Sequence, residues 1–261
     1  MDQLFNLSGK VAVVTGCGKG IGSAICSALA GRGAIVHGLD VDDESGSSHM
    51  AAIREAGGQA HYHHCNVVDH EKTGEVFAEV VKISGRLDIL VNNAGIANIG
   101  NVLTTTPEDM DRLYQVNIKG VYNCLHFGVK QMQLNGGGSI VNMGSVAAHV
   151  GLVDRFAYST TKGAVTTMTF SVAKDFIKDN IRCNAIAPAR VHTPFVDGYL
   201  KQYYPGNEKE MYAKLAATQP IGRMGTPKEI AHLVVYLCSE EAGFITGTVY
   251  PIDGGFMTLN T

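Results

Sequence analysis

A tyrosine and a lysine one helical turn apart are the residues in this chain best suited to acid–base chemistry. In the run Tyr158-x-x-x-Lys162 a phenol and an ammonium are four residues apart, which puts them on one face of a helix. A free tyrosine has a pKa near ~10, so action as a base near neutral pH requires a pKa about two to three units lower. An adjacent cation is the simplest source of that shift. Ser145 lies thirteen residues upstream, just past an expected strand, at the edge where such sheets bind ligands.

A glycine-rich turn near the N-terminus indicates dinucleotide binding. The first expected strand ends at Thr15 and leads into a helix through Gly16, Gly18, Lys19, Gly20 and Ile21. Glycines let the backbone turn tightly and approach a pyrophosphate, which then lies at the positive end of the helix. An acid, Asp40, follows eighteen residues after Gly22, at the end of the second expected strand. A carboxylate there accepts both hydroxyls of an adenosine ribose.

Two residues make opposite predictions about the form of the dinucleotide. Asp40 would repel the 2′-phosphate of NADP, so it favours NAD. Lys19, inside the turn, could instead meet that phosphate. We predict NAD, because the carboxylate of Asp40 would directly occupy the 2′ site. The alternative role for Asp40 is to cap a helix beside Asp42 and Asp43.

Taken together, these residues resemble the short-chain dehydrogenase/reductase family over essentially the whole chain. The matching motifs occur in order and at the family's spacing: TGCGKGIG at 15–22, Asn92-Asn93-Ala94-Gly95, Asn117, Ser145, YSTTK at 158–162, and Ile252-Asp253-Gly254-Gly255.

The resemblance implies a role for each catalytic residue. Tyr158 would be the general acid/base, and Ser145 would hold the substrate oxygen. Lys162 would bind the nicotinamide ribose and lower the pKa of the tyrosine, and Asn117 would support a proton relay. The reaction implied is hydride transfer between a secondary alcohol or ketone and the cofactor.

The resemblance also places cofactor contacts outside the glycine turn. It implies contacts at the adenine, the adenosine ribose and the nicotinamide by Asn66, Val67, Asn93, Ala94, Gly95, Tyr158, Lys162, Pro188, Val191 and Thr193. One departure is visible: the family usually has Pro-Gly after the sixth strand, whereas this chain has Pro188-Ala189. Alanine narrows the backbone freedom there, which puts the detailed path at the nicotinamide in doubt.

The elements that must position these residues alternate along the chain. Short β-branched runs alternate with longer helical stretches, which is typical of a parallel sheet covered by helices. Strands are expected over 11–15, 34–39, 61–65, 87–91, 138–143, 182–186 and 248–252, and helices near 21–31, 43–55, 72–83, 110–133, 157–178 and 228–239. We therefore predict an α/β, Rossmann-type doubly wound, mostly parallel seven-stranded sheet with helices on both faces. Residues 1–261 would form one domain, with a substrate loop at about 189–225.

The substrate is predicted from two arginines and a narrower resemblance. Sequence around Arg155, with motifs near 181–184 and 219–223, looks like the branch holding 2-keto-3-deoxy-fuconate and cytosolic 3-hydroxybutyrate dehydrogenases. Arg155 precedes Tyr158 by one turn and could clamp a carboxylate, or it could pair with Asp154 at the surface. Arg190 is a further candidate. Four tyrosines of the loop would suit a sugar face: Tyr199, Tyr203, Tyr204 and Tyr212.

Two other functions stay open at this stage. One is an NADP-dependent 3-oxoacyl-type reductase, which Lys19 would favour and Asp40 would not. The other is a dinucleotide-binding sensor or structural subunit on the same fold. A binding module needs the glycine turn but not the proton relay, so the intact catalytic set argues against it.

Composition limits the remaining possibilities. With 45% hydrophobic and 17% charged residues the chain is expected to be globular, and a net charge of −3 predicts no nucleic-acid partner. No apolar run is long enough to span a bilayer, and six scattered cysteines predict a reduced, cytoplasmic protein. His61 and His63 would face away from His64 on a strand, so we predict no metal site. The family resemblance implies a homo-oligomer, a tetramer or a dimer.

Overall fold

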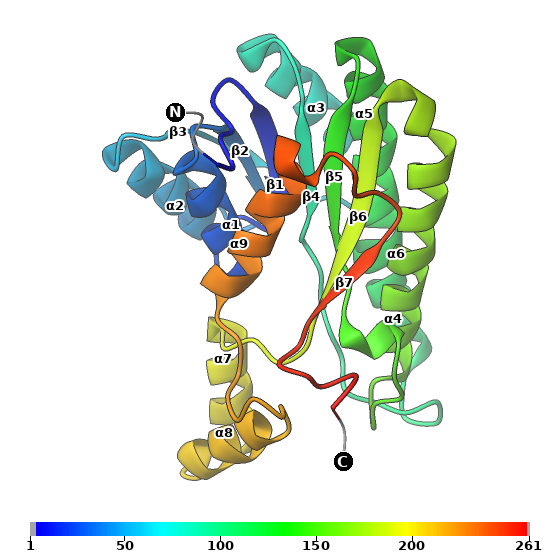
Figure 1. The fold of residues 1–261 in the computed structure, drawn as a ribbon. Coiled ribbons are helices and arrows are strands. Elements are labelled where there is room, and N and C mark those ends of the chain that lie inside the picture. The colour runs from blue at the N-terminus through cyan, green and yellow to red at the C-terminus, as the bar shows by residue number, and fades with distance from the viewer. Residues whose placement is uncertain (1–3, 260–261) are drawn as a thin grey trace.

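Seven parallel strands form one sheet in the computed structural model, which describes residues 4–259, with Phe195, Gln202 and Tyr203 described by their backbones only. The strand order is β3-β2-β1-β4-β5-β6-β7, so the winding reverses between β1 and β4 (Figure 1). The strands are β1 (Val11–Thr15), β2 (Ile35–Asp40), β3 (Gln59–His64), β4 (Ile89–Asn92), β5 (Gly138–Met143), β6 (Ile181–Pro188) and β7 (Val249–Ile252). All seven expected strands and the doubly wound class are confirmed.

Helices cover both faces of the sheet and bury one core on each. One face carries α1 (Gly20–Ala30), α2 (Asp43–Glu55) and α9 (Pro227–Cys238), and the other carries α3 (His70–Ser84), α5 (Gly120–Asn135) and α6 (Phe156–Asp175) (Figure 1). Ile25 and Val234 are fully buried on the first face, and Phe77 and Val165 are almost fully buried on the second. Each of these helices buries one apolar side against the sheet. All six cysteines are buried and free.

The helix expected near 110–133 is wrong as a single element. The chain forms α4 (Pro107–Leu113), then a π-helical turn, η1 (Tyr114–Lys119), and only then α5. A π turn adds a residue to the helical repeat and changes the direction of its side chains, and such turns are frequent at functional sites. Hydrophobic spacing alone does not reveal it, because the apolar residues on either side still fit a helix. The turn carries Asn117.

The substrate loop is helical as well as long. Within 189–225 lie α7 (Pro194–Tyr203) and α8 (Glu208–Ala217), beyond the carboxyl end of β6 (Figure 1). Val191 and Gly225 form a parallel bridge that ties both ends of the loop together at the sheet. The following helix, α9, begins with a capping box between Thr226 and Glu229.

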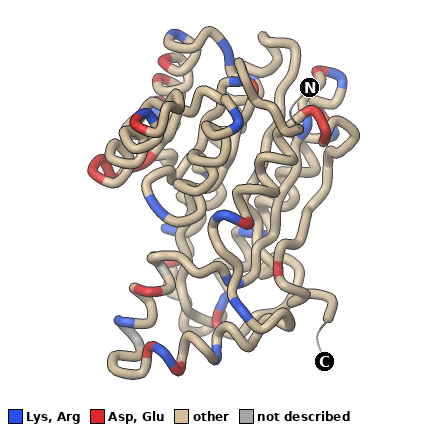
Figure 2. Tube along the Cα trace, turned by 60° about the vertical axis from the view of Figure 1, so that its left-hand side comes forward, with Lys and Arg blue, Asp and Glu red and all other residues tan. Residues whose placement is uncertain are grey.

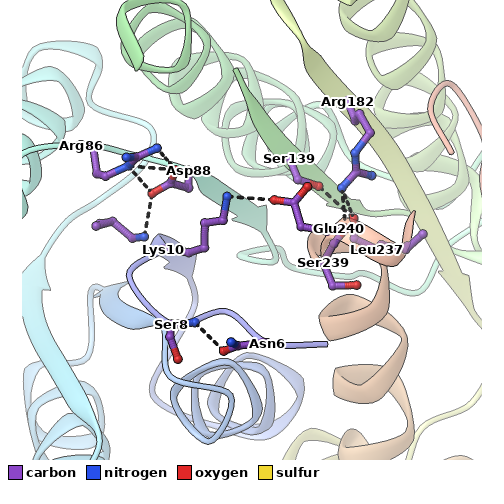
Figure 3. Close-up of polar contacts among 11 residues, drawn as sticks. Asn6, Ser8, Lys10, Arg86, Asp88, Ser139, Arg182, Leu237, Ser239 and Glu240 are labelled. Atoms are coloured by element: carbon purple, nitrogen blue, oxygen red, sulfur yellow. Dashed lines mark hydrogen bonds and ion pairs between the residues drawn. The ribbon is translucent and has the colours of Figure 1, made fainter. Parts of the chain in front are cut away.

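A network of polar contacts lies at the amino ends of the strands, the amino edge of the sheet (Figure 3). Asp88, 5% exposed, accepts from the backbone N–H of Val11 at 2.9 Å and from the Arg86 guanidinium. Arg182, at the start of β6, donates to the carbonyls of Leu237 and Ser239 at the end of α9. These bonds satisfy helix-end carbonyls that have no partner within the helix.

Charged residues of both signs are interspersed along the chain (Figure 2). Among the helices that the structure describes, none is both long and apolar enough to cross a membrane.

Candidate active site

Helix α6 presents Tyr158 and Lys162 on one face, as their spacing predicts. The Lys162 Nζ lies 5.7 Å from the centroid of the Tyr158 ring and donates to the Met143 carbonyl, at the end of β5, at 2.7 Å. The lysine is 5% exposed, and burial lowers its pKa to about 8. The ammonium has three N–H donors, so it can still donate toward a ligand.

The phenol of Tyr158 is influenced by burial and by two neighbours. Burial raises its pKa, because it penalises the phenolate, whereas a hydrogen bond with Ser145 and the charge of Arg155 lower it. Ser145 follows β5 and begins a short 3-10 helix, η2 (Val146–Ala148), where its Oγ accepts from the Ala147 N–H at 3.1 Å. That bond uses an oxygen lone pair, so the hydroxyl proton can be donated to another oxygen. The role expected for Lys162 in lowering the tyrosine pKa stays a prediction.

Asn117 on the π turn connects three segments of the site. Its Oδ1 accepts from the Ile96 N–H at 2.9 Å, and its Nδ2 donates to the Ile96 carbonyl and to the Thr161 hydroxyl at 3.0 Å. A Cβ placed on Gly95 would lie 3.3 Å from Asn117 Oδ1 and 3.6 Å from Lys162 Nζ. The predicted relay residues Asn117 and Lys162 therefore both lie against Gly95.

The glycine turn has the shape and the free N–H groups that a pyrophosphate needs. Gly16 has φ 70°, and a side chain at Gly22 would overlap the Gly16 carbonyl, so glycine is required at both positions. The N-terminus of α1 has no side-chain cap, so its first N–H groups are left for a ligand. Asp40 ends β2 beside this turn and accepts from the Gly18 N–H at 2.8 Å. These residues fit a dinucleotide.

Lys19 is turned toward an acid on the next loop. Its Nζ lies 2.8 Å from Asp42 Oδ2, and this pairing raises the pKa of Lys19. The alternative role of Asp40 as a helix cap falls to Asp42, which accepts from the Ser45 N–H at the start of α2. Asp40 itself lies outside that cap.

The other predicted cofactor residues follow the carboxyl edge of the sheet. Ala94 and Asn93 donate their backbone N–H groups to the Thr15 hydroxyl, which fixes the segment after β4 against the glycine turn. Val67 is buried and Asn66 is exposed just after β3. The substrate loop approaches the glycine turn from the other side, because a Cβ placed on Gly20 would lie 3.5 Å from Thr193 Cγ2.

Alanine at 189 causes no backbone strain. Among the described non-glycine residues, only Phe5, Asp154 and Asn180 have positive φ. Ala189 donates its N–H toward the Ile252 carbonyl at 3.4 Å, next to the end of β7. The departure from Pro-Gly therefore does not require a left-handed residue here.

A cavity of about 780 Å³ lies between η2, the start of α6 and the substrate loop. Its lining includes several residues predicted for the site, namely Ile21, Ser145, Arg155, Tyr158, Pro188, Arg190, Val191 and Thr193. Lys162, Asn117, Asp40, Asn66, Val67 and the segments 16–20 and 93–95 are not part of that lining. Of the four loop tyrosines only Tyr199 lines the cavity among the described side chains, and the side chain of Tyr203 lies outside the described residues.

The two predicted substrate arginines face this cavity without a carboxylate partner among the described residues. Arg155 donates to the backbone carbonyls of Asp154 at 3.1 Å and Asn98 at 3.5 Å, rather than to the carboxylate of Asp154. Arg190 donates to the Thr218 hydroxyl at 3.0 Å. Burial, and then the charge of Arg155, lower the pKa of Arg190. Two cations that repel each other across one cavity favour an anionic ligand.

Sequence analysis missed other lining residues, including Asn98, Gln219 and Met224. Asn98 follows β4, and Gln219 and Met224 lie within the substrate loop. Gln219 opens the motif at 219–223, but no spacing marked any of the three as a site residue. Their role depends on which loops the crossovers bring together.

Of the histidines on β2 and β3, His37 and His63 are buried, whereas His64 is exposed. His63 bonds to His37 at 2.9 Å, and His61 stacks on the same ring, whereas His64 points the other way to Asp43. This alternation is the one expected for a strand. The described residues contain no group of His, Cys, Asp and Glu able to hold a metal ion.

Comparison with known proteins identifies the family. A family model described as "Enoyl-(Acyl carrier protein) reductase" matches residues 16–257. An uncharacterized oxidoreductase of Thermotoga maritima is 37% identical over 250 residues, which cover 96% of this chain and 98% of that protein. The 3-oxoacyl-acyl-carrier-protein reductase of the same organism is 36% identical over 251 residues, 96% of this chain and 99% of its own. A crystal structure described as a short-chain dehydrogenase/reductase from Burkholderia xenovorans superposes with a TM-score of 0.93 at 31% identity, covering 98% and 99% of the two chains.

This chain therefore belongs to the short-chain dehydrogenase/reductase family and is an oxidoreductase of that family.

Proposed function

We propose that the chain is an NAD(H)-dependent oxidoreductase that interconverts a secondary alcohol and a ketone on a small hydroxy or keto acid. One observation carries the choice of an acid: Arg155 and Arg190 face the same cavity as Tyr158, and neither has a carboxylate partner among the described residues. A guanidinium suits a carboxylate because its fork of N–H groups donates two parallel bonds. This supports a substrate of the sugar-acid and hydroxy-acid class that the sequence favours.

In the proposed reaction Tyr158 moves a proton at the substrate oxygen. Ser145 donates its hydroxyl proton to that oxygen and holds it against the phenol. The phenolate of Tyr158 removes the hydroxyl proton as the alcohol is oxidised, and the phenol returns it in reduction. Lys162 passes protons between the phenol and the interior of the site, and Asn117, also beside Gly95, supports this relay by holding the segments around it. The nicotinamide supplies the hydride acceptor when it is bound.

Two contacts support NAD rather than NADP. The carboxylate of Asp40 lies at the glycine turn, where it would face a 2′-phosphate. Lys19, the residue that could offset this repulsion, is paired with Asp42. The pair is exposed and therefore weak, so the lysine could be released. The alternative is an NADP-dependent 3-oxoacyl-type reductase, which the name of one relative suggests.

The test is cofactor reduction by the purified chain, with NAD and NADP in parallel. The substrates are sugar acids, short hydroxy acids and neutral sugars or alcohols. We expect turnover with NAD on the acids and little on neutral compounds. Turnover only with NADP would favour the acyl reductase. Turnover only on neutral compounds would overturn the proposal that the substrate is an acid. Cofactor binding without turnover of any compound would favour the sensor.

A further inference from the structure

A buried amide beside the substrate cavity has no partner for either of its polar atoms. Asn98, in the segment between β4 and α4, is 9% exposed and lines the cavity. Among the described residues neither its Nδ2 nor its Oδ1 has a hydrogen-bond partner. Buried amides in native proteins are normally hydrogen-bonded, so an exception of this kind requires an explanation.

The backbone of the Asn98 segment is fixed against the catalytic helix. The Gly100 N–H donates to the Asp154 carbonyl, and the Phe156 N–H donates to the Gly100 carbonyl, both at 3.0 Å. Gly100 and Arg155 form a parallel bridge, and Arg155 also reaches the Asn98 carbonyl at 3.5 Å. The Asn98 segment is thus held beside the arginine that would bind a carboxylate.

The chemistry of the amide specifies its partner. A primary amide offers N–H donors and a carbonyl acceptor side by side, and a hydroxyl group both donates and accepts. A carboxylate only accepts hydrogen bonds, so it would leave the side-chain Oδ1 of Asn98 unpaired. Arg155 and Arg190 are better suited to bind a carboxylate.

We infer that Asn98 is a specificity-determining residue that hydrogen-bonds a second hydroxyl of the substrate, one that takes no part in the oxidation. The substrate class is then a polyhydroxylated acid, such as an aldonic acid, rather than a plain short hydroxy acid. This inference rests on the proposed function, because it takes the carboxylate to lie at the two arginines. It explains why no described residue pairs with this amide. A site built for a hydroxyl discriminates strongly against substrates that lack it.

The experiment compares Asn98→Leu with the unchanged protein on two kinds of acid, a panel of aldonic acids and 3-hydroxybutyrate. We expect kcat/KM for the preferred aldonic acid to fall by about 10- to 100-fold, and kcat/KM for 3-hydroxybutyrate to stay within about twofold. We also expect Tm to stay constant or rise, because leucine has nearly the shape of asparagine and leaves no unpaired polar atom. Thr105→Val is the matched control. It removes another buried unpartnered oxygen of the same segment, outside the cavity lining, and should leave kcat/KM unchanged for both acids, with Tm constant or higher by the same reasoning.

The remaining outcomes separate this inference from the proposed function. If both acids are turned over and Asn98→Leu lowers kcat/KM equally for both, or for neither, Asn98 does not bind a second hydroxyl. The proposal of an acid substrate then still holds. A lower Tm with equal losses would make Asn98 a structural residue. If the unchanged protein oxidises neutral alcohols but neither acid, the proposed function and this inference both fall.

Discussion

The two edges of the sheet treat their polar side chains in opposite ways. At the amino edge the chain satisfies its own groups: Val11 and Arg86 donate to Asp88, and Arg182 donates to the carbonyls of Leu237 and Ser239 at the end of α9 (Figure 3). At the carboxyl edge Arg155 and Arg190 have no carboxylate partner among the described residues.

This difference shows which side chains have hydrogen-bond donors available for a ligand. Charged groups are present at both edges, so charge does not distinguish them. What differs is whether the hydrogen-bonding capacity is used within the chain. Groups paired at the amino edge stabilise the fold, whereas the N–H groups that Arg155 and Arg190 do not use within the chain are available to a ligand at the carboxyl edge.

Tyr158→Phe should have the largest effect on activity. It removes the proton carrier from the carboxyl edge without changing the ring, so kcat should fall by about 10³-fold or more. NADH binding, measured by its fluorescence, should stay nearly unchanged, because the phenyl ring still fills the same space. Retained turnover would remove Tyr158 from the acid–base role.

A matched pair of arginine variants tests the comparison directly. Arg155→Met should lower kcat/KM for acids by about 10- to 100-fold with little change in Tm, because Arg155 bonds only two carbonyls within the chain. Arg182→Met should leave kcat/KM nearly intact and destabilise the fold by about 2 kcal/mol, since it removes three hydrogen bonds from a charged donor, to the carbonyls of Ile245, Leu237 and Ser239. Tm should then fall by about 4–8 °C, which scanning calorimetry measures.

The comparison would fail if the two variants behaved alike. It would also fail if Arg155→Met reduced kcat/KM for neutral sugars as much as for acids, because Arg155 would then not bind a carboxylate.

Asp40→Ser should change the choice of cofactor. Removing the carboxylate removes the repulsion of a 2′-phosphate, so the ratio of kcat/KM for NAD to that for NADP should fall by about tenfold. Lys19→Ala is the control, and it should leave the ratio unchanged while Asp42 holds the lysine. If Lys19→Ala raised the ratio markedly, the lysine would already contact the phosphate.

The smallest effect expected is on the pH profile of Arg155→Met. The charge of Arg155 lowers the pKa of Tyr158, so its removal raises that pKa. Alcohol oxidation needs the phenolate, which forms as pH rises through this pKa. The rising limb of kcat/KM against pH should therefore move to higher pH in the variant, and kinetics over a pH series measure it. A shift to lower pH would contradict the predicted coupling.

The sequence by itself determined the fold class and much of the cofactor site. The strand–helix alternation predicts the seven-stranded sheet, and the glycines at 16–22 with Asp40 predict a dinucleotide turn. The spacing of Tyr158 and Lys162 alone puts them on one face of α6. These features are local, since each depends on residues adjacent along one element or at the end of one strand.

Only the tertiary structure decided which groups meet at the substrate. Arg155 and Arg190 lie on segments that follow different strands, and only the parallel crossovers bring them to one cavity. The unpartnered state of Asn98 likewise depends on the packing around it. The π turn at Asn117 replaces a helix that periodicity predicts as continuous. The burial of a side chain and its neighbours in a cavity depend on segments distant in the sequence, so no local pattern of residues predicts them.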